Sequence, residues 1–144
     1  MSYLSASRVR QRVAATLADL AGWRESRWSQ QLFRSDPRPG SHLSYAVGIS
    51  ASGLHSGERR QRRSEGLLVE TAVTVTFSQV VKGDDMNGSQ DAALDAIELV
   101  IRTVLGASRN DLHLLYSNYA LSTAAEGYIV ADVEFRAIHR ITLT

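Results

Sequence analysis

The chain contains no cysteine, only two prolines and a single lysine, Lys82. Without cysteine there is no disulfide bond and no thiolate metal site, so the redox conditions of its compartment stay open. No run of about 18 apolar residues occurs, so we expect no membrane-spanning helix. The first residues, MSYLSASRVRQRV, are polar and basic and lack the apolar centre of a signal peptide. We therefore expect no secretion.

Length and composition are typical of one globular domain, which we place at residues 1–144. Hydrophobic residues make up 44% of the chain and charged residues 22%, with no biased tract and no internal repeat. A chain of this size buries about 70% of the surface that it exposes when unfolded. That burial is sufficient for independent folding.

Charge is nearly balanced overall but unevenly distributed along the chain, whose formal net charge is +1. Residues 1–66 carry 11 arginines against 5 acidic residues, a balance of +6. Residues 67–144 carry 4 arginines and Lys82 against 10 acidic residues, a balance of −5. Opposite charges on two parts of one chain favour head-to-tail attraction between copies.

Two segments have the periodicity of amphipathic helices. The first begins at a Ser5 or Ser7 cap and ends near Gly22. Its apolar residues recur at three or four positions, which is one helical stripe: Val9, Val13, Leu17 and Leu20. The second is expected to be capped by Ser89, to carry Asp91 in its first turn and to end at Gly106. Its apolar face comprises Leu94, Ile97, Ile101, Val104 and Leu105.

Four segments are strand candidates. HLSYAVGIS (42–50) and LLVETAVTVTFSQVV (67–81) alternate apolar and polar residues, and the segment between them is polar and glycine-flanked, which predicts a long hairpin. LHLLYSNYAL (112–121) is a less regular candidate. YIVADVEFRAIHRITL (128–143) alternates over its whole length, with Asp132, Glu134, Arg136 and Arg140 on one side. That polar side implies water or a partner rather than a second core.

These elements predict an α+β fold in the order α-β-β-α-β-β. The connection from the second strand through the second helix to the third strand is a crossover, expected to be right-handed. Hairpins supply the other pairings. We therefore expect a four-stranded mixed sheet with both helices packed on one face and a long hairpin between the first two strands.

Between the first helix and the first strand lies an aromatic segment that contains Trp23 and Trp28. It is too apolar for a free linker. Packing over the edge of the core is the favoured interpretation, and a subunit contact is the alternative, because aromatic residues are enriched in interface cores. Arg8 and Arg12 lie off the apolar stripe of the first helix and face solvent or a partner, so we add them to the interface candidates.

Catalytic and metal-binding patterns are missing from the sequence. The four histidines lie on different elements, with no metal-ligand spacing. GISASG (48–53) is not a nucleophile elbow, because position 52 is serine and no helix follows. Asp84 and Asp85 lack the twelve-residue calcium-loop pattern. We therefore expect no enzymatic activity, no metal and no cofactor.

The strongest local feature is the arginine cluster of HSGERRQRRSEG (55–66), formed by Arg59, Arg60, Arg62 and Arg63. Three interpretations stay open: a solvated loop, docking to an acidic neighbouring surface, and contact with DNA. Arginines that neutralise phosphates give salt-dependent affinity. The segment has no aromatic residue for base stacking, and no helix-turn-helix or zinc finger accompanies it.

The whole pattern resembles that of bacteriophage tail terminator proteins, and the resemblance spans nearly the entire chain. It depends on the first helix, SRVRQRVAATLADLAG, and on the strand pair SYAVGIS and VETAVTVTF. It continues through the amphipathic segment DAALDAIELVIRTVL and the closing strand YIVADVEFRAIHRITL.

This resemblance implies a structural virion protein at the junction of tail and head, assembled in the host cytoplasm. Six copies would form a homohexameric ring that caps the last ring of tail-tube protein, ends tube polymerisation and contacts the head-side connector. The genome would pass through the ring without sequence-specific binding, so arginines would line the channel or an interface. Another head–tail connector or neck protein, and a nucleic-acid-binding module that uses Arg59, Arg60, Arg62 and Arg63, are the alternatives.

Overall fold

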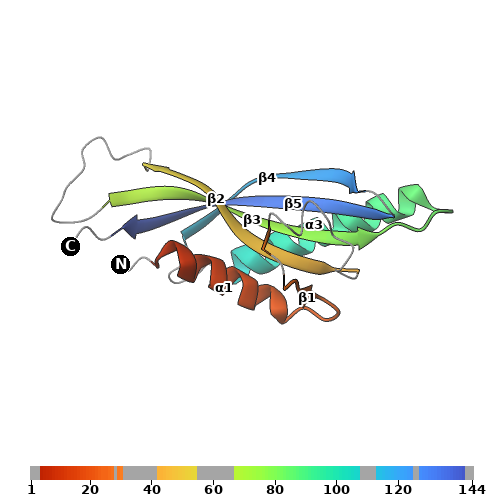
Figure 1. Ribbon diagram of the computed structural model, residues 1–144, viewed down its shortest axis with the longest axis horizontal. Coiled ribbons are helices and arrows are strands. Elements are labelled where there is room, and N and C mark those ends of the chain that lie inside the picture. Colours follow the sequence, from red (N-terminus) through yellow and green to blue (C-terminus); the bar gives the residue numbers. More distant parts are fainter. Residues whose placement is uncertain are drawn as a thin grey trace.

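Helices and strands occupy most of the residues that the computed structural model describes, namely 4–27, 29–30, 42–54, 67–107, 113–124 and 127–141. The helices are α1 (Ala6–Ala18) and α3 (Met86–Ala107). The strands are β1 (Arg24–Glu25), β2 (Ser44–Leu54), β3 (Leu67–Val80), β4 (His113–Ala124) and β5 (Tyr128–Ile141). Figure 1 shows both helices on one side of the long, twisted sheet.

The sheet has five strands, which lie side by side in the order β1-β2-β3-β5-β4. Along the chain the elements follow the order α-β-β-β-α-β-β, so the expected four strands and the expected order α-β-β-α-β-β were wrong by one strand, β1. The additional strand, β1, is parallel to β2 and is joined to it by backbone bonds from Arg24 N to the Leu43 oxygen (3.2 Å) and from Ser26 N to the Tyr45 oxygen (2.7 Å). Two polar residues have no alternating pattern. Only pairing with β2 identifies β1 as a strand.

The remaining strands pair antiparallel and include the predicted hairpin of β2 with β3. β3 and β4 each pair antiparallel with β5, which lies between them. β3 and β4 therefore run in the same direction, and α3 forms the crossover that connects them. The mixed α+β architecture with two helices agrees with the sequence pattern.

The core lies between the sheet and the two helices. α1 contributes Val9, Val13 and Leu17, and α3 contributes Ile97, Val100 and Val104; the sheet contributes Tyr45, Val73, Val75, Phe77, Val133 and Phe135. The Tyr45 hydroxyl donates a 2.9 Å hydrogen bond to the Ala14 carbonyl and so joins β2 to α1. Burial, helped by the charges of Glu25 and Asp19, raises the pKa of Tyr45 to about 12. Tyr45 is therefore a neutral hydrogen-bond donor at physiological pH.

α1 begins at the expected cap, because the Arg8 amide donates to the Ser5 hydroxyl over 3.4 Å. α3 begins earlier than expected. Its cap is Asp85, whose Oδ1 accepts from the Gly88 amide at 2.9 Å. Ser89 lies inside the helix, where its hydroxyl accepts from Lys82 N and donates to the Asp85 carbonyl. The expected cap at Ser89 was therefore wrong: an aspartate four residues upstream satisfies the free amides first.

Gly88 is where the Asp85 carboxylate approaches the helix backbone most closely, since a methyl group there would overlap Asp85 Oδ2. In the wild type, Gly88→Ala displaces the carboxylate and loses about 1 kcal/mol of capping, which offsets a gain of roughly 0.5–1 kcal/mol from removing a helical glycine. In an Asp85→Ala background the same substitution stabilises the protein by roughly 0.5–1 kcal/mol. Urea unfolding of the four proteins measures this coupling, and equal effects in both backgrounds contradict the cap.

Candidate interaction surface

Of the interface residues that the sequence predicts, the structure describes only Arg8, Arg12 and Trp23. Arg59, Arg60, Arg62, Arg63 and Trp28 lie outside the described residues. Arg8 and Arg12 are exposed on α1, as their position off the apolar stripe indicates.

Trp23 is a core residue. It is 9% exposed, its ring packs edge-on against Phe77 with centroids 5.1 Å apart, and it lies 6.3 Å from the Tyr45 ring. Aromatic pairs at these separations add to the stability gained from burial. The structure therefore agrees with the packing interpretation of Trp23 and removes this residue from the interface candidates.

No group of three or more histidine, aspartate or glutamate side chains suited to a metal ion occurs among the described residues. Asp85 is engaged as the cap of α3, and the His42 ring accepts from Val80 N over 3.3 Å. Within the same residues, no helix is long and apolar enough to cross a membrane.

A cleft of about 430 Å³ lies where the end of β3 meets the start of α3, and its lining includes His42, Lys82, Asp85 and Ser89. Its polar groups bond to one another: Ser89 bonds Lys82 N, and Asp85 bonds Gly88 N. These bonds hold the start of α3 against the end of β3. They give Ser89 and Asp85 a structural role in the cleft.

The sheet face opposite the helices is polar, as the alternation of β5 predicts. The Gln30 amide donates to the Thr76 hydroxyl at 2.8 Å, and that hydroxyl donates to Asp132 at 2.6 Å. The Gln30 side chain lies directly over Gly48, where a methyl group would collide with it. Gln30, which follows β1 in the chain, therefore covers the part of this face at Gly48 of β2 and Thr76 of β3.

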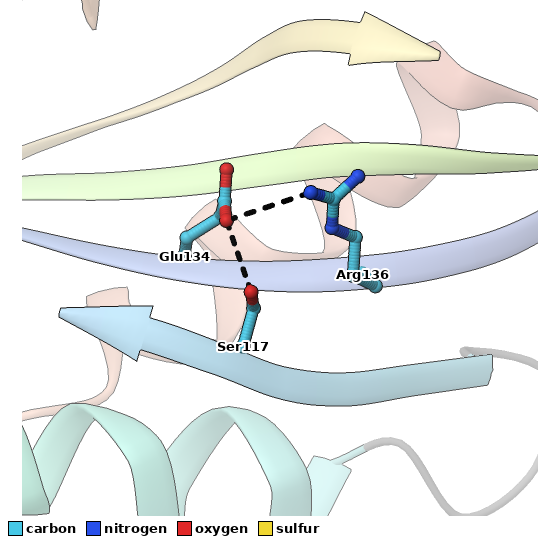
Figure 2. Close-up of polar contacts among 3 residues, drawn as sticks. All are labelled: Ser117, Glu134 and Arg136. Carbon is cyan, nitrogen blue, oxygen red and sulfur yellow. Dashed lines mark hydrogen bonds and ion pairs between the residues drawn. The ribbon is translucent and has the colours of Figure 1, made fainter. Parts of the chain in front are cut away.

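Nearer β4 the same face carries the contacts drawn in Figure 2. The Ser117 hydroxyl donates to Glu134 at 3.0 Å, and the Arg136 guanidinium lies 3.9 Å from the same carboxylate oxygen. Arg136 is exposed and Glu134 is partly exposed. Such exposed ion pairs contribute little to stability. This strip is a hydrated, charged surface beside the last strand.

β4 is a long edge strand with many exposed side chains. Among the described strands its partner is β5, and residues 115–120 are all exposed. Leu115 is 62% exposed, Tyr119 48% and Tyr116 40%, although the Tyr116 ring also packs edge-on against Phe135 at 6.3 Å. The sequence contains one local signal of this edge strand, which the composition of the whole chain does not show. Residues 113–124, HLLYSNYALSTA, include no aspartate, glutamate, lysine or arginine.

On the helical face of the sheet, the sign of the exposed charges differs between the edge at β1 and β2 and the edge at β4 and β5. α1 packs against β1 and β2, whereas α3 packs against β5 and β4. Exposed charges on the first side are mostly basic, namely Arg8, Arg12, Arg24 and Arg27 with Asp19 and Glu25. Exposed charges on the second side are mostly acidic, namely Asp84, Asp85, Asp91, Asp95 and Glu98 with Lys82 and Arg102. The charge difference between the two halves of the sequence thus becomes a difference between two sides of the fold.

No protein-family model matches the chain, and no curated protein is significantly similar to it in sequence. Surface chemistry is therefore the basis for assigning a function. Two surface features bear on that function: the exposed β4 edge and the opposite charges at the two edges of the sheet.

One buried ionisable group requires an explanation. His139 is 3% exposed, and its Nε2 shares a short hydrogen bond with the Thr71 hydroxyl. Its Nδ1 is buried and has no hydrogen-bond partner in the described part of the chain. Burial lowers the pKa of His139 below its ordinary value of 6.5, because the charged ring would lose its hydration. The neutral ring is therefore a structural residue of the core edge.

The lowered pKa of His139 makes the free energy of unfolding depend on pH. The unfolded chain binds the proton more tightly than the folded protein, so this contribution is complete above pH 6.5 and falls as the pH drops towards the lower, folded-state pKa. Urea midpoints at several pH values between about 7.5 and 5 measure the fall. In His139→Gln the fall is smaller. An identical pH dependence in both proteins would remove His139 as its source.

Proposed function

We propose that this chain is a structural phage virion protein, whose copies form a ring that caps the tail tube and joins the tail to the head connector. The observation that carries the proposal is the combination of an exposed, uncharged edge strand with sides of opposite charge. Two different surfaces that complement each other generate a closed ring by head-to-tail contact when the rotation between neighbouring copies closes. The resemblance to tail terminator proteins supplies the sixfold stoichiometry, the tube and the connector as partners, and the virion as location.

Such a role requires complementary contact surfaces rather than catalysis. A stable interface requires about 800 Å² from each partner. A ring subunit has two lateral contacts and two further faces, one for the tube protein and one for the connector. The elongated sheet and its polar face, with Arg136 exposed and Glu134 partly exposed beside β4, supply polar surface for such contacts. No turnover of a substrate is required.

The arginine cluster keeps a nucleic-acid-binding module as the second candidate. Arg59, Arg60, Arg62 and Arg63 lie between β2 and β3, in the connection of the hairpin. In the ring, the same cluster would face the DNA channel or an acidic neighbouring surface. The two candidates differ in whether isolated protein binds DNA.

Disruption of the reading frame of this chain in its phage tests the ring function. We expect tail tubes of uncontrolled length and DNA-filled heads without tails, because nothing then ends polymerisation or offers a face to the connector. Electron microscopy of lysates measures both. Complementation with the intact chain should restore tails of uniform length. Normal particles without the chain would overturn the proposal.

The DNA-binding alternative predicts that the isolated protein binds duplex DNA at low salt. Each arginine that neutralises a phosphate contributes about −0.9 to the slope of log affinity against log salt concentration. Fluorescence anisotropy over a salt series measures this slope. Replacing Arg59, Arg60, Arg62 and Arg63 with alanine should remove the salt-dependent binding, whereas Arg102→Ala, on α3, is the control. Unchanged affinity in the fourfold variant excludes the alternative.

A further inference from the structure

The outer edge of β4 resembles a sheet edge to which a further strand can be added. A strand at the end of a sheet leaves one row of backbone N–H and C=O groups without strand partners. Natural edge strands are normally protected by charged side chains, especially lysine, by proline, by β-bulges or by being short. β4 spans twelve residues, His113–Ala124, and contains neither lysine nor proline. Its one irregularity, between Tyr116 and Asn118, interrupts the ladder with β5 only locally.

Apolar side chains extend this edge onto the helical side. Tyr116 and Tyr119 are exposed along the strand, and Met86 at the start of α3 is 52% exposed. A shallow groove of about 190 Å³ lies between α3 and the end of β4, lined by Met86, Gln90, Leu121 and Ile129 among others. Exposed aromatic and methionine side chains beside a free strand edge are typical of a protein interface.

The opposite edge of the same sheet has the complementary character. In the described part of the chain, β1 pairs with β2 at Ser44 and Tyr45. Beyond β1 lies an open cleft of about 520 Å³, whose lining includes Arg10, Arg27, Val47 and Ile49. Ile49 is 36% exposed there. This edge therefore offers Arg10 and Arg27, with Glu25 also in the lining, around a mixed polar and apolar floor, whereas the β4 edge offers apolar residues beside the acidic side of α3.

We propose that the β4 edge is a docking surface for a second copy of this chain, which presents its β1 edge with Arg24 and Arg27. The occupant follows from charge: the acidic residues Asp91 and Glu98 of the helix beside β4 are exposed, and the basic edge that complements them belongs to the chain itself. The contact uses two different edges, so it can propagate into a ring. The inference rests on the proposed self-assembly and identifies its lateral contact.

Tyr119 is the residue at which to test this contact, because it is half exposed on the edge and its removal leaves the core intact. Tyr119→Lys introduces a like charge against Arg24 and Arg27 of the neighbour, whereas Tyr119→Glu removes the same ring but adds an attractive charge. We expect the wild type to self-associate at ~100 µM in roughly 50 mM salt, where charges are weakly screened. Tyr119→Lys should raise the concentration for half-association by about tenfold or more, and Tyr119→Glu by clearly less.

Size-exclusion chromatography with light scattering measures association over a concentration series. Ile141→Lys is the matched control: it also replaces an exposed apolar strand residue with lysine, but at the end of β5, opposite Leu67 of β3 and beyond the residues that pair with β4, and should associate as the wild type does. Circular dichroism and thermal unfolding verify that each variant is folded. A monomeric wild type, or equal effects of lysine and glutamate at residue 119, overturns the docking surface.

Failure of this inference is distinguishable from failure of the proposed function. If loss of the chain causes overlong tails but Tyr119→Lys associates normally, the ring function stands and the β4 contact is wrong. If Tyr119→Lys abolishes association but loss of the chain leaves tails normal, the contact stands and the proposed function is wrong. Arg27→Glu, on the other edge, should reproduce the defect of Tyr119→Lys when the contact is correct.

Discussion

The uninterrupted ladder between β3 and β5 is the interaction on which the rest of the structure depends. It runs from Leu67 opposite Ile141 to Val80 opposite Tyr128 without a shift in register. Because side chains alternate along both strands, this register places Val75 beside Val133 on the helical side and Thr76 beside Asp132 on the other. A slip of one residue would exchange the two faces. The helices then pack where the apolar rows lie.

The position of these two strands also decides which strands lie at the edges. With β3 and β5 at the centre, β2 and β4 occupy the flanks, and the short β1 covers a small part of β2. α1 follows the β2 side and α3 the β4 side, so each helix brings its own charges to one flank. The same arrangement that builds the core therefore separates basic from acidic surface. The proposed self-assembly uses these two flanks.

Sequence reasoning was most successful where a periodic pattern was long. The apolar rows of β3 and β5 form as predicted, and so does the α1 stripe at Val9, Val13 and Leu17. The predicted face of α3 is correct in part: Ile97 and Val104 are buried, whereas Leu94, Ile101 and Leu105 are only partly buried. It failed where structure depends on a contact made elsewhere in the chain. Two polar residues become β1 only because β2 pairs with them, and Asp85 replaces Ser89 as a cap because its carboxylate reaches the Gly88 amide.

The candidate surface was likewise predictable from the sequence only in part. The sequence by itself determined which residues could be buried, that its halves differ in charge, and that no familiar catalytic spacing is present, because these depend on composition and on local periodicity. Only the tertiary structure decided that Trp23 belongs to the core, that β4 is an edge strand with Leu115 and Tyr119 exposed, and that the basic and acidic groups lie on opposite flanks. Exposure is a property of what packs against a residue, and strand order is set by pairing between segments distant in the chain, so neither can be read from local spacing.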